Sequence, residues 1–222
     1  MSAIAPVLLA IDSATTRVVV ALGTTDGAVL DATDWPAGYR HGETLMAAID
    51  ALLSRFAIER IRIAAIVVGT GPGAFTGLRV GLATAKGLAH ALDRPVIGIS
   101  TADALLAGAP DGAVLLLPAG PSDRLVVRRG ASARLVPAGA DPGIGADAPL
   151  LALDLDGRAP ADALVRGEAA RARLGASLIE FGAARLAAQD VDDLARLVPE
   201  YVTLPRGVGA AGGEVSWSRD RR

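Results

Sequence analysis

Five short runs of aliphatic and β-branched residues, interrupted by two stretches with helical spacing, constrain the fold of the first 105 residues. The runs occupy residues 7–11, 18–22, 28–35, 63–68 and 96–100. The first three are joined by tight turns, which predicts an antiparallel meander. Apolar residues then recur at helical spacing over 45–56, and a second helix is expected over 78–92. The order β-β-β-α-β-α-β predicts an α/β fold in which two right-handed crossovers follow the meander.

The composition favours a layered α/β core. Apolar residues make up 51% of the 222 residues and aromatic residues only 3%, so the core must be aliphatic. In the second half, strands are expected at 113–117, 125–128 and 150–155, and a helix at 169–188, with Gly/Pro-rich loops between them. The Gly-rich tail, residues 207–222, is predicted to be disordered.

Charge and residue usage exclude several functions. A net charge of −2 argues against binding nucleic acid alone, and the absence of cysteine excludes disulfides, thiolate zinc sites and a cysteine nucleophile. His41 and His90, the only histidines, have no partner at helical spacing, so no metal site is expected. The N-terminus lacks the basic segment of a signal peptide, and no apolar run nears the roughly 20 residues of a membrane span. We therefore expect a soluble, cytoplasmic protein.

A glycine-rich turn follows the strand at 63–68. Turns of this kind often hold phosphates with backbone N–H groups, but Thr76-Gly77-Leu78 does not match a Walker A loop, and no third glycine completes a dinucleotide fingerprint. Pro72 also lacks an N–H donor. Two interpretations stay open for Gly71 and Gly73, namely contact with a nucleotide or tight packing of the turn.

The turn after the first strand contains Asp12 and Thr15, which complete the nucleotide-binding candidates. Asp12 either faces a ligand or forms an Asx turn. No catalytic residue is predicted. The segment 153–157 is similar to the Asp-x-Asp-Gly motif of phosphatases, but a strand followed by a turn is the favoured interpretation. The serines at 13, 100 and 132 lack a Gly-x-Ser-x-Gly elbow.

The helix at 78–92 has one face with almost no side-chain bulk, formed by Gly77, Gly81, Ala85 and Ala89 at intervals of four. Glycines inside a helix cost about 1 kcal/mol each relative to alanine, so packing should compensate for them. Small residues let a second helix approach closely, either within the chain or from a partner. The side chains of Arg79 and Lys86 are expected to pair with partner carboxylates or to face solvent.

Several segments resemble the TsaB family, in the family's order and at its approximate spacing. They are residues 10–15, 41–43, 71–81 and 96–101, with a weaker likeness at 199–206. The resemblance implies an actin/hexokinase/Hsp70-like (ASKHA, ribonuclease H-like) two-lobed fold with a mixed five-stranded sheet in the first lobe. The lobes are expected at 1–105 and 106–206, the second smaller and degenerate. Where the family commonly has Asp-Ala-Arg, this chain has Pro118-Ala119-Gly120, which weakens the case for a magnesium site.

The resemblance also implies a non-catalytic scaffold subunit in the formation of threonylcarbamoyladenosine on tRNA. Such a subunit forms a heterodimer with the catalytic subunit TsaD and recruits the ATPase TsaE, and it meets tRNA only through the complex. It has no cofactor of its own, but ATP or ADP and Mg are candidates at the interfaces of the complex. Two alternatives stay open: an independent ASKHA-type kinase or ATPase, and a homodimer when TsaD is absent. The partner-interface candidates are Leu45, Ile49, Leu52, Gly77, Arg79, Val80, Gly81, Ala83, Ala85, Lys86 and Gly87.

Overall fold

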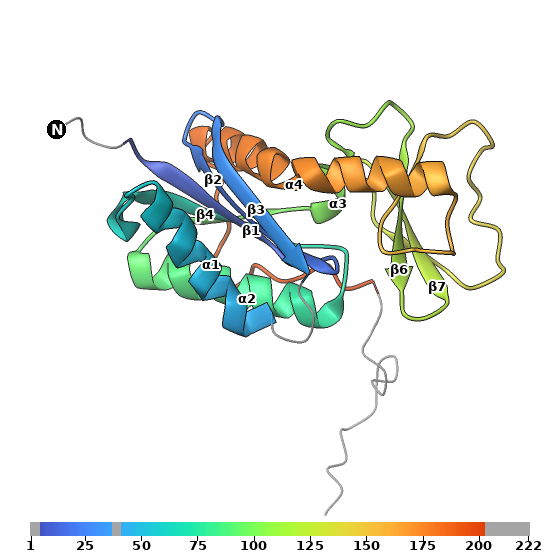
Figure 1. Cartoon of the computed structure of the whole chain (residues 1–222), viewed down its shortest axis with the longest axis horizontal. Helices are drawn as coiled ribbons and strands as arrows, with labels where there is room; N and C mark the ends of the chain where they lie inside the picture. The colour runs from blue at the N-terminus through green and yellow to red at the C-terminus, as the bar shows by residue number, and fades with distance from the viewer. Residues whose placement is uncertain (1–4, 37–40, 203–222) are drawn as a thin grey trace, which may run out of the picture.

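A computed structural model describes residues 5–36 and 41–202, and its first half contains a five-stranded sheet of order β3-β2-β1-β4-β5 (Figure 1). The strands are β1 (Val7–Asp12), β2 (Arg17–Thr24), β3 (Val29–Pro36), β4 (Ile63–Gly69) and β5 (Val96–Ile99). The pairs β1–β2 and β2–β3 are antiparallel, whereas β1–β4 and β4–β5 are parallel. The predicted mixed sheet and its element order are confirmed. The predicted tail at 207–222 lies outside the described residues.

Two helices, α1 (His41–Arg55) and α2 (Phe75–Leu92), cover one face of this sheet, and a 3₁₀ turn (Arg60–Arg62) leads into β4. Strand β1 is buried on both faces, because Leu9 and Ile11 pack toward α1 and α2 while Leu8 and Ala10 pack toward the opposite layer. In a strand that is covered on both faces, all side chains are buried, so polar and apolar residues do not alternate along it. This burial explains why β1 is a continuous apolar run in the sequence.

The opposite face is covered by the short helix α3 (Thr101–Leu106) and the long helix α4 (Ala161–Ala187), which is drawn above the sheet in Figure 1. Helix α4 is about 40 Å long, enough to reach beyond the first sheet. Its C-terminal half places Leu178 and Ile179 in the core of the first sheet, and its N-terminal half places Ala163 in the core of the second.

The second sheet has the order β8-β7-β6-β9. Its strands are β6 (Val114–Ala119), β7 (Asp123–Arg128), β8 (Arg134–Val136) and β9 (Leu150–Ala152). Strands β6 and β7 pair antiparallel, and β9 joins β6 in parallel. The division into lobes at 1–105 and 106–206 stays a prediction, but α4 shows that both parts contribute to one core.

The sequence analysis missed three elements, namely the 3₁₀ turn at Arg60–Arg62, helix α3 and strand β8, and it placed α4 too short. Helix α3 has only six residues and is capped by Ser100, whose hydroxyl accepts a hydrogen bond from the Asp103 N–H at 3.2 Å. Strand β8 has three residues. Elements this short are too brief to show a period in the sequence. Helix α4 begins at residue 161, whereas the sequence analysis placed its start at 169. The prediction started too late because Gly167 is a poor helix former. A glycine is needed there because the helix lies against the backbone of Ala152 in β9.

Candidate functional site

A cavity of about 380 Å³ lies where the turns at the end of the first sheet face the second sheet. One wall is formed by the β1–β2 turn and the glycine turn, and the other by the end of β6 and the following Gly120. Asp154, Tyr201 and Val202 complete the lining. Among the described residues that line the cavity, Asp154 is the only carboxylate, so this part of the chain places no acidic pair across it.

Asp12 is fully buried beside this cavity, at 0% exposure. Its Oδ1 accepts a hydrogen bond from the Ala14 N–H at 2.8 Å, and its Oδ2 accepts one from the Thr101 hydroxyl at 2.6 Å. Burial raises the pKa of the Asp12 carboxyl from 3.8 to about 6, although the hydrogen bonds from Thr101 and Ala14 oppose this effect. The Asx-turn interpretation is therefore confirmed, and Asp12 joins β1 to the start of α3.

The glycine turn packs tightly against the same segment of chain. Gly71 has φ = +102°, a conformation that favours glycine, and its N–H donates to the Thr101 hydroxyl at 3.0 Å. A Cβ at Gly73 would overlap the carbonyl oxygen of Ala14. Thr15 is 3% exposed and its hydroxyl donates to the Arg17 carbonyl at 3.2 Å.

These contacts bear on whether a nucleotide and its magnesium ion fit the site. The carboxylate of Asp12 and the N–H of Gly71 are engaged within the chain, and the side chain of Thr15 is buried. Across residues 5–36 and 41–202, no group of three or more acidic or histidine side chains is placed to hold a metal ion. Asp12, the predicted acidic ligand, and the Gly71 N–H are therefore already engaged within the chain, and nucleotide binding at this turn stays a prediction.

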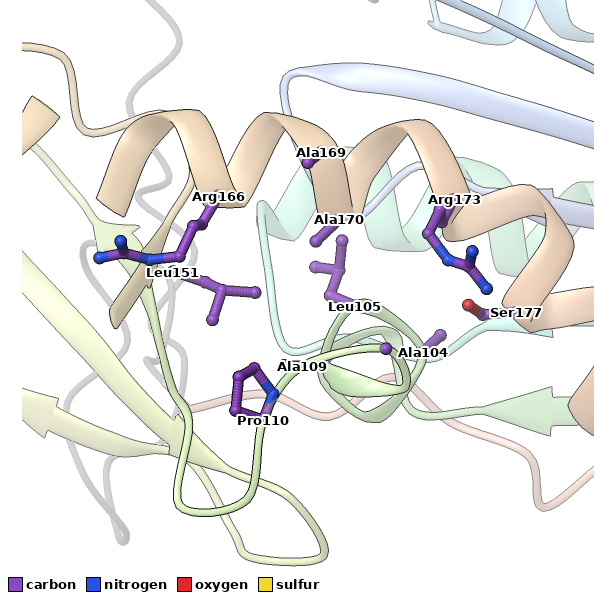
Figure 2. A pocket seen from close by; sticks show the side chains of 11 residues that line it. Ala104, Leu105, Ala109, Pro110, Leu151, Arg166, Ala169, Ala170, Arg173 and Ser177 are labelled. Atoms are coloured by element: carbon purple, nitrogen blue, oxygen red, sulfur yellow. The ribbon is translucent and has the colours of Figure 1, made fainter. Parts of the chain in front are cut away.

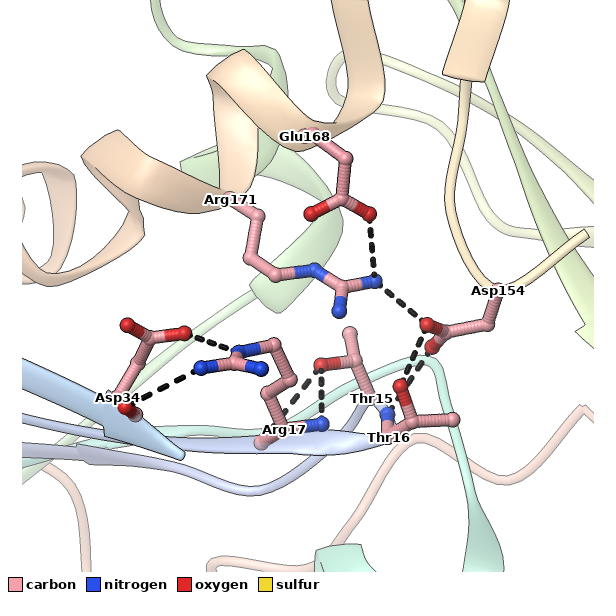
Figure 3. A network of polar contacts seen from close by, with 7 residues as sticks. All are labelled: Thr15, Thr16, Arg17, Asp34, Asp154, Glu168 and Arg171. Atoms are coloured by element: carbon pink, nitrogen blue, oxygen red, sulfur yellow. Dashed lines mark hydrogen bonds and ion pairs between the residues drawn. The ribbon is translucent and has the colours of Figure 1, made fainter. Parts of the chain in front are cut away.

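Asp154 makes a different set of contacts, shown in Figure 3. It follows β9, and its carboxylate accepts hydrogen bonds from the N–H and the hydroxyl of Thr16 and from the guanidinium of Arg171. Glu168 lies 3.5 Å from the same guanidinium nitrogen. The segment around Asp154 thus forms a strand and a turn, as the sequence analysis favoured, and it also connects the two sheets.

Helices α1 and α2 contain all of the predicted partner-interface residues, and the structure separates these into two groups. Leu45, Ile49 and Leu52 are at most 1% exposed, and Gly77, Gly81 and Ala85 are also buried. These six lie in the chain's own core, because the apolar side of an amphipathic helix faces its own sheet, and their contact with a partner stays a prediction. Ala83, Gly87 and Arg79 are exposed, and Val80 and Lys86 are half-buried.

The small-residue face of α2 packs against the β1–β2 turn. The Ser13 hydroxyl donates a hydrogen bond to the Gly77 carbonyl at 2.7 Å, and a Cβ at Gly81 would overlap the Ser13 Oγ. The glycines of this face therefore permit close approach within the chain, but by the β1–β2 turn and not by the second helix that the sequence analysis expected. At Gly87, on another side of α2, an added Cβ would meet nothing within 4 Å.

Comparison with known proteins identifies the family to which this chain belongs. A sequence profile described as "TsaD: tRNA N6-adenosine threonylcarbamoyltransferase" matches residues 35–198. The tRNA threonylcarbamoyladenosine biosynthesis protein TsaB of Escherichia coli is 36% identical over 114 residues, which are 50% of this chain and 48% of that protein. The chain belongs to the TsaD family, as one of its TsaB members.

Other comparisons are shorter or more distant. An uncharacterised protein of Mycobacterium tuberculosis is 45% identical over 65 residues, which are 29% of this chain and 31% of that protein. These matches span less than half of the curated relatives' own length. YeaZ from Pseudomonas aeruginosa superposes with a TM-score of 0.67 at 22% identity, over 89% of this chain and 100% of that one. Together with the profile match, this likeness supports the ASKHA-like α/β fold that the TsaB resemblance implied, with its mixed five-stranded sheet and a second sheet.

The C-terminal segment of this TsaB-family chain lies along the first sheet and α2, which the sequence analysis did not anticipate. The Asp192 N–H donates to the Val96 carbonyl at 3.0 Å, and the Lys86 Nζ donates to the Ala195 and Leu197 carbonyls at 3.5 and 3.2 Å. Lys86 therefore binds its own chain. The weaker likeness at 199–206 is the only sequence signal for this segment, and residues 203–206 lie outside the described residues.

Arg79 is engaged by the end of the same segment. Its Nε donates to the Tyr201 hydroxyl at 2.9 Å, and its guanidinium stacks on the Phe75 ring at 3.8 Å from the centroid. Arg79 is exposed and makes these contacts within the chain, and its pairing with partner carboxylates stays a prediction. These contacts hold Tyr201 in the lining of the cavity.

A second cavity of about 200 Å³ lies between α3 and α4 (Figure 2). Apolar side chains such as Leu105 and Leu151 form most of its lining, with Arg166, Arg173 and Ser177 as its polar members. Arg166 already donates to the Leu150 carbonyl and to Asp162. This cavity contains none of the predicted site residues. Within the part of the chain that the structure describes, no helix has the length and apolar character needed to cross a membrane.

Proposed function

We propose that this chain takes part in forming threonylcarbamoyladenosine on tRNA, as a cytoplasmic, non-catalytic subunit. The names of its TsaB and TsaD relatives support the pathway. The engagement of Asp12 supports the non-catalytic role, because a buried carboxylate bonded to Thr101 and Ala14 is not available to hold magnesium or activate a substrate. This contact of Asp12 is the observation that carries the proposal.

A partner surface is proposed on the outer side of α1 and α2. Met46 is 39% exposed, Ala47 and Ala51 are exposed on α1, and Ala83 and Gly87 are exposed on α2. Both helices cover the same face of the first sheet (Figure 1), and apart from Met46 these exposed residues have little or no side chain. Such a surface suits close packing of helices from another protein.

We propose that the partner is a TsaD-type subunit, with a TsaE-type ATPase joining the complex and tRNA binding only through it. ATP or ADP and Mg would then belong to interfaces of the complex and not to this chain alone. In the absence of the TsaD-type subunit, the same surface would pair two copies of this chain. The independent kinase or ATPase alternative has no support from the cavity, whose lining has one carboxylate.

The test is co-purification with the TsaD-type protein of the same organism, followed by a threonylcarbamoyl-transfer assay with and without this chain. Ala83→Arg and Gly87→Arg should each abolish co-purification and reduce transfer, because they place a long charged side chain on the proposed surface. Neither position is buried, so both variants should fold. Ala172→Arg, at an exposed position of α4, is the matched control.

Three results would contradict the proposal. One is normal complex formation by both variants with their fold confirmed by circular dichroism. Another is equal loss of binding with Ala172→Arg. The third is ATP turnover or transfer by the isolated chain, which would favour the independent enzyme.

A further inference from the structure

We propose that the cleft between the two sheets contains a built oxyanion site, and that the chain's own Asp154 carboxylate fills it. The site consists of the Thr16 N–H, the Thr16 hydroxyl and the Arg171 guanidinium. Because the carboxylate occupies it, the two sheets are held together without a bound ligand. This inference does not depend on the proposed role in tRNA modification.

The contacts have the form in which proteins hold small oxyanions. The Thr16 N–H donates to Asp154 Oδ2 at 3.0 Å, the Thr16 hydroxyl donates to Oδ1 at 2.6 Å, and the Arg171 Nη2 donates to Oδ1 at 2.5 Å. Both carboxylate oxygens are thus bound by donors from distant parts of the chain (Figure 3). Charged hydrogen bonds of this length are among the stronger ones in proteins.

The cationic member of the site is buried. The side chain of Arg171 is 6% exposed and that of Asp154 is 11% exposed. The Arg171 Nε is also buried and has no hydrogen-bond partner among the described residues. A buried guanidinium needs a compensating anion, and Glu168, at 3.5 Å with a side chain 60% exposed, is a weaker neighbour. Asp154 is therefore the anion on which the burial of Arg171 depends.

The backbone conformation around Asp154 directs its carboxylate toward Thr16 and Arg171. Asp154 has φ = +57°, a left-handed conformation that aspartate adopts more readily than most residues. The Leu153 N–H donates to the Leu116 carbonyl at 3.1 Å, and Arg158 donates to the Asp154 carbonyl at 3.2 Å. The loop is thus held on both sides of Asp154.

The ligand class follows from the donors. Of the three donors to the carboxylate only Arg171 is charged, while the neighbouring Arg158 binds the Asp154 carbonyl. This set suits a small monoanionic group, either a carboxylate or a singly charged phosphate. In the wild-type chain, any such ligand in the cavity would have to displace Asp154. The cleft should therefore bind oxyanions only after the Asp154 carboxylate is removed.

The test uses the full chain and formate, which has the size of the group that Asp154→Ala deletes. Asp154→Ala should lower Tm by about 6–12 °C, since it leaves the Arg171 charge uncompensated. Sodium formate at about ten times its dissociation constant should then raise the Tm of Asp154→Ala by about 3–6 °C. Acetate should have a smaller effect because its methyl group does not fit the vacated space.

Asp154→Asn is the matched control, because its amide still fills the site. It should lose stability as well, but formate should shift its Tm no more than it shifts that of the wild type. All proteins are compared at equal ionic strength, balanced with sodium chloride. Equal formate shifts in the three proteins, or no shift in Asp154→Ala, would overturn the proposal, as would an unchanged Tm in Asp154→Ala.

A double-mutant cycle keeps the proposal testable should Asp154→Ala fail to fold. Thr16→Ala removes one donor and should lower Tm in the wild-type background, but have a clearly smaller effect in the Asp154→Asn background. Additive effects of the two substitutions would show that Thr16 and Asp154 do not act as a unit, which contradicts the assigned site.

Discussion

Replacing Asp12 by asparagine should change how the stability of this chain depends on pH. Asp12 is fully buried, and burial raises its pKa from 3.8 to about 6 in the folded chain. An acid with a raised pKa binds its proton more tightly in the folded state than in the unfolded state. Its contribution therefore favours folding at low pH and is lost as pH rises from about 4 through about 6.

The size of this effect follows from the same two pKa values. Since a tenfold change in proton affinity corresponds to about 1.4 kcal/mol, raising the pKa from 3.8 to about 6 costs about 3 kcal/mol of folding free energy once Asp12 is ionised. Asparagine cannot ionise. The free energy of unfolding of Asp12→Asn, relative to the wild type, should thus increase by about 3 kcal/mol between pH 3.5 and pH 8.

Urea denaturation at several pH values measures this difference directly. Asp12→Asn also alters the hydrogen bond to Thr101, but that loss is a constant offset and does not change with pH. Asp147→Asn, at an exposed position, serves as the control and should run parallel to the wild type. Parallel profiles for Asp12→Asn and the wild type would refute the reasoning, because they would show that Asp12 does not bind its proton more tightly on folding.

Three further predictions concern α2. Gly81→Ala should lower the free energy of unfolding by about 1–3 kcal/mol in urea denaturation, because the new Cβ overlaps the Ser13 Oγ; an unchanged value would contradict this packing. Gly87→Ala should raise it by about 0.5–1 kcal/mol, since alanine is the better helix former and the Cβ meets open space; a loss of stability would contradict this. Lys86→Met should speed hydrogen–deuterium exchange in residues 192–200 several-fold, because Lys86 binds two carbonyls of that segment, and unchanged exchange would show that these bonds do not hold it.

The first sheet could be predicted because its strands are covered on both faces or joined by short turns. Strands β1 and β4 are buried along nearly their whole length, so each is a continuous apolar run in the sequence. The same reasoning missed β8, whose three residues include two exposed ones. The same reasoning also predicted too short a helix for α4. Gly167 interrupts the helical pattern in the sequence, and a glycine is needed there because the helix packs closely against β9.

The candidate site was less predictable, since its bonds join distant residues. The turn at Asp12 was visible locally as an Asx turn, but its partner Thr101 lies 89 residues away. Asp154 and Thr16 are 138 residues apart in the sequence, and no local motif around either residue predicts their contact. Likewise, the spacing of Gly77 and Gly81 predicted a close approach, but not that Ser13 of the same chain would make it.

The sequence by itself determined the element order of the first half, its aliphatic core and its membership among TsaB-like chains. These properties depend on local periodicity and short motifs, which a single chain displays residue by residue. Tertiary structure alone decided which sides of α1 and α2 are free and which carboxylate stands in the cleft. Long-range packing determines both, because a residue faces solvent, a partner or its own core only once the segments around it are placed.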